Sequence, residues 1–211
     1  MQVIEQSHKI LNLEQLKLSM QMLESAGRVC YKSECKNHEE FLRNIIKRGH
    51  ESVLEHVSVN FLFITDRGIS HELVRHRIAS YSQESTRYCN YSSGRFNGEL
   101  TFVLPDFLKM SDLQGTKSEV AECWYHACEI SEMSYKLMMT LARKPQEARS
   151  VLNNSLKTEV FATFNIRSLR NMLRLRTAPD AHPQMQKLMK PVLQELYSHF
   201  PFLFEDLIKE K

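Results

Sequence analysis

Polar and apolar residues alternate most clearly in the stretch VSVNFLFIT, residues 57–65. A period of two places alternate side chains on one face of a strand, here Val57, Val59, Phe61 and Phe63. The stretches ELTFVLP (residues 99–105) and KTEVFATF (residues 157–164) also have strand character, and Pro105 would end the first of them. The pattern therefore predicts three strands.

Elsewhere the apolar residues recur every three or four positions, which is the period of an amphipathic helix. Asp66 and Asn165 are suited to cap the starts of two helices, and Pro145 is suited to the first turn of another. The expected helices are residues 12–25, 38–48, 66–77, 118–142, 145–152, 165–176, 181–198 and 201–210. Strands and helices mix without a regular βαβ alternation, so we expect an α+β fold. It would be a single domain over residues 1–211, with a small, mostly antiparallel sheet packed by helices.

Composition narrows the class of protein. Of the 211 residues, 42% are hydrophobic and 25% are charged, which is typical of a folded globular protein. A net charge of +3 is mild for a protein that coats nucleic acid. No stretch reaches the length of a membrane span, and the first 16 residues lack the apolar core of a signal peptide. We therefore expect no membrane partner and a cytoplasmic location.

The cysteine and histidine spacings do not predict a metal site. The two histidines of HELVRH are five residues apart, so they fall on different faces of a helix. No CxxC motif occurs, and the number of cysteines is odd. We expect reduced and mostly buried cysteines at Cys30, Cys35, Cys89, Cys123 and Cys128.

The stretch RHRIASYSQESTRY, residues 75–88 and here called the RHR segment, gathers three arginines and a histidine around small hydroxyl and amide side chains. On a helix ending near Arg77, both His76 and Arg77 would follow the apolar stripe of Ile69 and Leu73 and point into the protein or a pocket. If residues 82–88 are extended, one face carries Gln83, Ser85 and Arg87. An amide, a hydroxyl and a guanidinium together suit a ligand with a phosphate and a polar ring. A solvated basic loop is the alternative.

A second set of cations lies on the helix expected over residues 165–176. Its polar stripe consists of Arg167, Asn171 and Arg174. Arg176 ends the apolar stripe, where the pattern predicts leucine, and such exceptions are enriched at functional sites. Arg149 adds a cation upstream, whereas we expect Arg170 and Arg174 to form surface ion pairs. Neither GxGxxG nor GxxxxGK[ST] occurs, so arginines and asparagines would have to hold any dinucleotide.

The RHR segment has an RHR triplet, a seven-residue spacer and a serine, followed by x-Arg-Tyr. This arrangement resembles the signature of the flavin-dependent thymidylate synthases. The stretches GHESVLEH (residues 49–56), EAR (147–149) and NIRSLRNMLRLR (165–176) resemble further segments of that family. Asn153 departs from the pattern, because many members have proline there. The resemblance covers most of residues 45–190.

The resemblance implies synthesis of dTMP from dUMP. In that family methylenetetrahydrofolate supplies the carbon, NADPH supplies the electrons, and bound FAD carries both; no metal takes part. The members have an α+β fold and form homotetramers whose active sites combine residues from several subunits. dUMP, NADPH and folate are thus the implied partners.

The resemblance also implies the site residues by position. Those matching dUMP contacts are Glu72, Arg75, Gln83, Ser85, Thr86, Arg87, Arg149 and Arg176. Those matching FAD contacts are Ser58, Arg75, His76, Arg77, Gln83, Asn165, Arg167, Asn171 and His182. Three have catalytic roles: Arg176 would stabilise uracil deprotonated at N3, Ser85 would donate or accept hydrogen bonds, and His56 would lie beside the isoalloxazine ring. We read Cys89, just past the RHR segment, as structural.

Two other functions are compatible with parts of the sequence. A basic module could bind nucleic acid through phosphate contacts from the RHR segment and the helix at residues 165–176. The mild net charge and the apolar stripe beneath Arg176 argue against this module, and no nucleic-acid partner is expected. A family member could also have lost turnover and kept nucleotide binding, but Ser85, Arg87 and Arg176 are all present.

Overall fold

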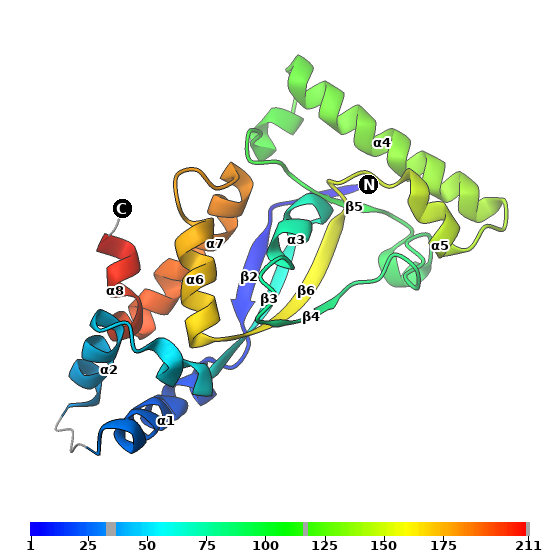
Figure 1. Ribbon diagram of the computed structural model, residues 1–211. Coiled ribbons are helices and arrows are strands. Elements are labelled where there is room, and N and C mark those ends of the chain that lie inside the picture. Colours follow the sequence, from blue (N-terminus) through cyan, green and yellow to red (C-terminus); the bar gives the residue numbers. More distant parts are fainter. Residues whose placement is uncertain (33–36, 116–117, 210–211) are drawn as a thin grey trace. The chain divides into compact units, whose positions relative to one another are not determined.

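Four strands form the main sheet of the structure, a computed structural model that describes residues 1–32, 37–115 and 118–209. Their order across the sheet is β2 (Ser7–Ile10), β3 (Ser58–Asp66), β6 (Lys157–Asn165) and β4 (Ser80–Gln83) (Figure 1). A second sheet pairs β1 (Gln2–Ile4) with β5 (Thr101–Val103) in parallel. Together with the helices described below, these sheets confirm the predicted α+β class.

Strand β3 runs antiparallel to both of its neighbours. Beside β2, Thr65 Oγ1 donates to Gln6 Oε1 at 3.1 Å, and the Leu11 N–H donates to the Asn60 carbonyl at 2.8 Å. Residue numbers therefore rise on one strand as they fall on the other. β3 is also antiparallel to β6, where the bonded pairs are Ile166 with Val57 and Thr163 with Asn60.

The two long strands are the ones that the sequence pattern predicted. β3 and β6 span nine residues each and bury alternate side chains, so a period of two is visible in both. The strand expected over residues 99–105 is shorter, because β5 has only three residues. β1, β2 and β4 were not predicted, since three or four residues offer too few positions to show a period.

The helices agree with the predicted ones except at their ends. Their bounds are α1 Leu13–Tyr31, α2 His38–Lys47, α3 Arg67–Leu73, α4 Glu119–Thr140, α5 Pro145–Ala148, α6 Ile166–Arg176, α7 Pro183–His199 and α8 Pro201–Lys209. Short 3₁₀ turns lie at Glu51–His56, Gly94–Phe96, Met110–Leu113 and Arg149–Val151. The side chains of Asp66 and Asn165 cap α3 and α6 as predicted.

The prediction of a helix through Arg77 is wrong, because α3 ends at Leu73. After Val74 the chain turns to enter β4. The Tyr81 hydroxyl donates to the His76 carbonyl at 2.8 Å, and the Tyr81 ring packs edge-on against Phe164. These contacts hold the backbone at His76 outside the helix, so His76 and Arg77 do not continue its apolar stripe.

The chain divides into two compact units, which are treated separately below. Unit 1 comprises Met1–Ser7, Phe63–Val74 and Ser82–Val160. Unit 2 comprises His8–Leu62, Arg75–Tyr81 and Phe161–Lys211. Strands β3 and β6 contribute residues to both units. The single domain expected over residues 1–211 stays a prediction.

The core of unit 1 forms around aromatic residues from a loop, from β5 and from α4. Tyr91, Phe102 and Tyr135 are buried there with Cys128, and Cys89 packs at the edge of the cluster. Cys89 therefore has the structural role predicted for it. Figure 1 shows α4 and α5 side by side in this unit, where they contact each other.

The prediction of mostly buried cysteines is wrong for the described residues. All four described cysteines are unpaired thiols, but only Cys128 is buried. Cys30 and Cys123 are exposed because they fall on the outward sides of α1 and α4. Cys35 lies outside the described residues.

In unit 2, Arg170 is buried, which corrects the expected surface ion pair. Its side chain is 1% exposed, because α8 packs against α6 and covers it. Nη2 and Nη1 of Arg170 donate to the two carboxylate oxygens of Asp206 at 2.6 and 2.9 Å, and Nη1 also bonds the Leu203 carbonyl. Arg174 fits the prediction better, since it is exposed and lies 3.8 Å from Asp206.

Removing the carboxylate of Asp206 would leave the buried Arg170 guanidinium with only the more distant carboxylate of Glu51, 3.7 Å from Nε. We expect Asp206→Asn to lower the free energy of unfolding by about 2–3 kcal/mol, measured by urea denaturation at pH 7. Glu205→Gln is the matched control, because Glu205 pairs with the partly exposed Arg43 and should contribute below about 1 kcal/mol. Equal stability of the two variants would contradict the buried pair.

The same pair should also make stability depend on pH. Burial alone would raise the pKa of Asp206, but the Arg170 guanidinium holds that pKa below its usual range. A carboxyl with a lowered pKa in the folded state adds stability above the pKa of the unfolded chain, and this stability is lost as the pH falls. Asp206→Asn should lack this acid-side loss.

Candidate functional site

Unit 2 contains a cavity of about 790 Å³ that collects the cations predicted from two separate sequence stretches. The RHR segment contributes Arg75, His76, Arg77 and Ile78 to its lining, and α6 with its cap contributes Asn165, Arg167, Ser168, Asn171, Arg174, Leu175 and Arg176. The carboxylates of Glu51 and Glu55 complete it. The polar stripe predicted on residues 165–176 therefore faces one cavity.

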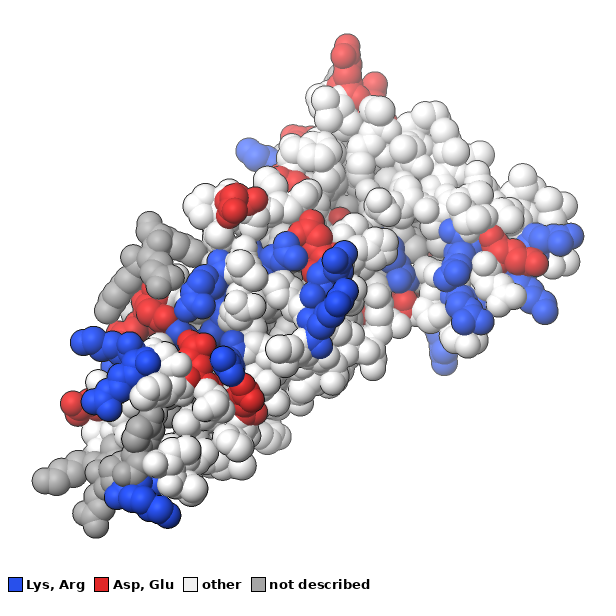
Figure 2. All heavy atoms as spheres, in the orientation of Figure 1, with Lys and Arg blue, Asp and Glu red and all other residues white. Residues whose placement is uncertain are grey.

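The arginines of this cavity differ in their partners. Arg167 Nη1 lies 2.6 Å from Glu55 Oε1, and Arg167 Nε lies 3.9 Å from Glu51. Arg75 and Arg77 are exposed and form no ion pair with the described residues of unit 2. Figure 2 shows Lys and Arg side chains interspersed with Asp and Glu over α6 and its neighbours. The cavity thus retains positive charge that a bound anion could neutralise.

His76 and Arg176 meet inside the same cavity. Arg176 Nε donates to His76 Nε2 at 2.9 Å, so the neutral imidazole carries its proton on Nδ1. Two causes lower the pKa of His76 to about 4. Burial is the larger, and the nearby Arg176 guanidinium is the second. At neutral pH the imidazole is uncharged and Arg176 keeps its full positive charge. The apolar stripe beneath Arg176 is buried as predicted, at Leu169, Met172 and Leu173.

Two amide residues of the cavity come from α6 and its N-cap. Asn165 caps the helix, since its Oδ1 accepts the Ser168 N–H at 2.8 Å and the Ser168 hydroxyl at 2.7 Å. Asn171 is exposed on the same side as Arg167, one turn along the helix. The capping residue Asn165 and the exposed Asn171 therefore both line the cavity.

Unit 1 holds the remaining polar residues of the RHR segment. Gln83 Nε2 donates to Ser70 Oγ at 2.9 Å and to Thr158 Oγ1 at 3.2 Å, and both hydroxyl residues are fully buried. Neither Ser70 nor Thr158 was picked out from the sequence. Thr158 had a visible signal, because it occupies an inward position of the alternating strand β6.

The extended conformation considered for residues 82–88 is wrong beyond Glu84. The Ser85 carbonyl accepts the N–H groups of Tyr88 and Cys89, at 3.1 and 2.9 Å, and these bonds form a turn. Inside the turn, Ser85 Oγ accepts the Arg87 N–H at 3.3 Å. Gln83, Ser85 and Arg87 therefore do not share the face of one strand.

The turn nevertheless lies beside a cation from far along the chain. Arg149 Nη1 donates to Thr86 Oγ1 at 3.4 Å, across a separation of 63 residues. Arg87 and Arg149 are both exposed, and neither forms an ion pair with the described residues of unit 1. Thr86, Arg87 and Arg149 can together offer two guanidinium groups and a hydroxyl to a phosphate.

Some predicted site residues lie neither in the lining of the unit 2 cavity nor in the turn that begins at Ser85. Among the described residues, the lining of the unit 2 cavity does not include His56, Ser58 or His182. His182 caps α7, where its Nδ1 accepts the Gln184 N–H at 3.2 Å. The Ser58 carbonyl accepts from Asn12 Nδ2 at 3.1 Å. Glu72 is half-buried on α3 in unit 1.

Comparison with known proteins identifies the family. The family model described as "Thymidylate synthase complementing protein" matches residues 13–202. A flavin-dependent thymidylate synthase of Mycobacterium sp. (strain JLS) is 36% identical over 205 residues, covering 88% of this chain and 78% of that relative. The chain belongs to the flavin-dependent thymidylate synthase family. This confirms the resemblance found in the RHR segment.

Further relatives agree with this assignment to the flavin-dependent thymidylate synthases. The enzyme of that name from Mycobacterium tuberculosis (strain CDC 1551 / Oshkosh) is 34% identical over 203 residues, covering 88% of this chain and 78% of the relative. The crystal structure of the UMP/dUMP methylase PolB from Streptomyces cacaoi, bound with 5-Br UMP, superposes with a TM-score of 0.77 at 21% identity. It covers 97% of this chain and 95% of that one, and it shows a shared fold.

Two features are absent from the described residues. No helix among them is long and apolar enough to cross a membrane. No group of three or more histidine, cysteine, aspartate or glutamate side chains among them could hold a metal ion.

The contact between Arg176 and His76 predicts a change in pKa. We expect Arg176→Gln to raise the pKa of His76 above about 4, because one cause of the lowering is removed, while burial keeps it below the ordinary 6.5. An NMR titration of the His76 imidazole would measure this pKa. Arg174→Gln is the control, since it removes a charge from the same cavity and keeps the bond. An unchanged pKa in Arg176→Gln would show that the two side chains do not interact.

Proposed function

We propose that this protein is a flavin-dependent thymidylate synthase that converts dUMP to dTMP, with methylenetetrahydrofolate as carbon donor and NADPH as reductant through bound FAD. Membership in the family supports the reaction. The observation that carries the proposal is that the RHR segment and α6 place their cations around one cavity. That arrangement is what a family without a Rossmann motif needs in order to bind a dinucleotide.

The residues of the unit 2 cavity fit FAD. Its pyrophosphate is anionic, and Arg75 and Arg77 have no carboxylate partner among the described residues of unit 2. The amides of Asn165 and Asn171 add polar groups suited to the ribityl chain or a ring edge. His76, Arg167, Ser58, Gln83 and His182 complete the proposed FAD contacts, with His56 beside the flavin ring. When bound, FAD supplies the redox and carbon-transfer chemistry.

We assign dUMP to the residues of the turn and their neighbours. Arg87 and Arg149 would bind the phosphate, and the hydroxyls of Ser85 and Thr86 would donate to it. The other proposed contacts are Glu72, Arg75, Gln83 and Arg176. Ser85 acts as a hydrogen-bonding residue, because its hydroxyl accepts the Arg87 N–H and no base among the described residues bonds it.

Arg176 would stabilise the uracil ring after loss of its N3 proton. The charge of this guanidinium is not cancelled by His76, which is neutral well above pH 4. The bond to His76 also fixes the direction of Arg176 Nε, so the cation is oriented before the substrate arrives. A fixed cation beside a developing anion lowers the barrier to reaction at C5.

We also propose a homotetramer with active sites shared between subunits. An apolar stripe on α4 supports the assembly. Its members are Ile130, Met133 and Leu137 on the helix and Leu141 at its C-cap, which are 50–69% exposed and recur at helical spacing. The opposite face of α4 is already buried in unit 1, at Cys128 and Tyr135. A 22-residue helix that is apolar on both faces is typical of a buried helix, so we expect a second copy to cover the outer stripe.

Oxidation of NADPH by the purified protein with FAD, with and without dUMP, tests the function. We expect dUMP to accelerate oxidation strongly, and dTMP to form when methylenetetrahydrofolate is added. Arg87→Ala should weaken dUMP binding by about 2 kcal/mol, because a charge-assisted phosphate bond is lost. Arg143→Ala, an exposed arginine outside the proposed site, is the control.

The result that would contradict this function is a colourless protein that binds no flavin and ignores dUMP. Tight, steeply salt-dependent binding to duplex DNA would then favour the nucleic-acid module. Saturable dUMP binding without turnover would indicate the member that has lost catalysis.

The α4 stripe predicts how the tetramer can be broken. We expect Leu137→Asp to shift the protein to smaller species in analytical ultracentrifugation, because a carboxylate would be buried at the contact. Lys190→Gln changes an exposed charge on α7, outside the stripe, and should leave the assembly intact. A wild-type monomer that retains FAD would contradict the shared-site assembly.

A further inference from the structure

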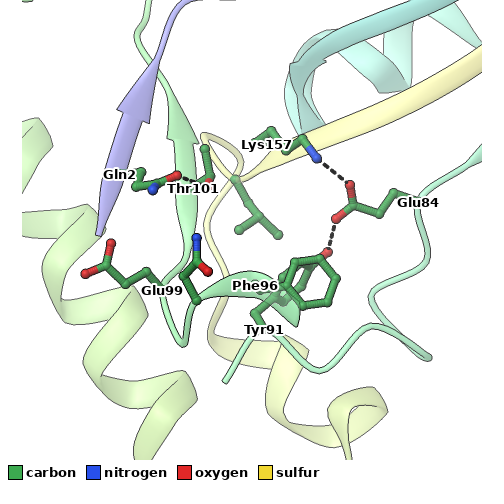
Figure 3. Close-up of a pocket in the computed structure, with 9 residues that line it drawn as sticks. Gln2, Glu84, Tyr91, Phe96, Glu99, Thr101 and Lys157 are labelled. Atoms are coloured by element: carbon green, nitrogen blue, oxygen red, sulfur yellow. Dashed lines mark hydrogen bonds and ion pairs between the residues drawn. The ribbon is translucent and has the colours of Figure 1, made fainter. Parts of the chain in front are cut away.

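Glu84 is the only carboxylate of the RHR segment, and it sits between Gln83 and Ser85. A carboxylate would repel the phosphate that its neighbours are proposed to bind. Its side chain is 11% exposed and points into unit 1, toward Tyr91 and Lys157 (Figure 3). The charge is therefore turned away from solvent and from a ligand bound by its neighbours.

All the polar groups of Glu84 have partners in unit 1. Oε1 accepts the Tyr91 hydroxyl at 2.6 Å, and Oε2 accepts from Lys157 Nζ at 2.9 Å. On the main chain, the Glu84 N–H donates to the Glu159 carbonyl at 2.9 Å, and the Glu84 carbonyl accepts from Arg67 Nη2 at 2.7 Å. The residue is thus fixed by four different partners.

The partners of the carboxylate are themselves held in place. Tyr91 is 4% exposed, and its ring packs edge-on against Phe96 at 5.0 Å and tilted against Tyr135 at 5.8 Å. Lys157 is 18% exposed, belongs to β6 and also pairs with Glu159. Beside this group lies a cavity of only about 180 Å³, whose lining includes Glu84, Tyr91, Phe96 and Lys157 (Figure 3).

The two oxygens of the Glu84 carboxylate face different kinds of donor, and the cation among them, Lys157, is shared with Glu159. Burial would lower the pKa of Lys157, but its bonds to Glu159 and Glu84 raise it, so the ammonium stays charged. Burial, followed by the bond to Glu84, raises the pKa of Tyr91 far above its usual range, so the phenol keeps the proton it donates. Glu84 thus has a cation on one oxygen and a neutral donor on the other.

The bond to Tyr91 closes the loop that carries the proposed dUMP ligands. Glu84 is the last residue before the turn that begins at Ser85, and Tyr91 follows its end. The carboxylate therefore ties together the two ends of residues 85–90, while Lys157 ties them to β6. Closing a short loop restricts the conformations of everything inside it.

We propose that Glu84 is a positioning residue for dUMP, which holds the loop of residues 85–90 in the conformation that presents Ser85, Thr86 and Arg87. This inference rests on the function proposed above. Glu84 would touch neither dUMP nor FAD, since both of its carboxylate oxygens are engaged inside unit 1. Its negative charge is offset by Lys157, which lowers the repulsion it would otherwise exert on a phosphate.

Two variants test the inference in the turnover assay. Tyr91→Phe removes one donor and keeps the ring, and Glu84→Gln removes the charge and keeps the shape. We expect each to raise the KM for dUMP about tenfold, with kcat within roughly twofold of wild type, because a bond to a charged group is lost while the reacting groups remain. FAD content should not change, since the proposed FAD ligands on α6 are not altered.

The control is Glu159→Gln, which removes the other carboxylate that contacts Lys157 but leaves the Glu84–Tyr91 bond. It is 45% exposed and should leave the KM for dUMP unchanged. The double variant Glu84→Gln/Tyr91→Phe should raise KM by less than the product of the single effects, because both act through one bond.

The outcomes separate this inference from the function it rests on. A wild-type protein without dUMP-dependent turnover would count against the function. With an active wild type, an unchanged KM in Tyr91→Phe overturns the positioning role, even if the melting temperature falls. If Glu84→Gln does not fold, the KM of Tyr91→Phe, compared with that of the control Glu159→Gln, still tests the positioning role.

Discussion

A guanidinium group withdrawn from water requires an anion or a strong acceptor, and this requirement separates the arginines of the chain into classes. Arg170 is fully buried and has its anion, Asp206, within unit 2. Arg176 is half-buried against a neutral imidazole and keeps its charge. Arg87 and Arg149 remain exposed beside a turn of hydroxyl residues. The first class stabilises the fold, and the others include the proposed dUMP ligands.

Polar groups under the proposed site follow the same physical rule. Ser70 and Thr158 are fully buried, and their hydroxyls accept from the amide of Gln83. Glu84 is mostly buried, with a cation and a phenol as partners. Such groups are stable only when every donor and acceptor is satisfied, which also makes their positions well defined. The residues that would contact dUMP thus rest on a layer of polar contacts with little freedom to move.

The sequence could predict the features that depend on neighbours in the chain. The alternation of β3 and β6 and the caps Asp66 and Asn165 are local, and all of them are present. Features that depend on distant partners were missed. Lys157 reaches Glu84 across 73 residues, and Asp206 reaches the buried Arg170 across 36. Periodicity along one element carries no information on what another element will bring against it.

The spacing of the RHR segment has a physical cause in β4 (Ser80–Gln83). Arg75–Tyr81 belong to unit 2, and Arg75–Ile78 line its cavity, whereas Ser85, Thr86 and Arg87, which are proposed dUMP ligands, belong to unit 1. Side chains alternate along a strand, so one inserted residue would move Gln83 away from Thr158 and turn the Glu84 position away from Lys157. The seven residues between Arg77 and Ser85 are therefore set by the register of the strand between them.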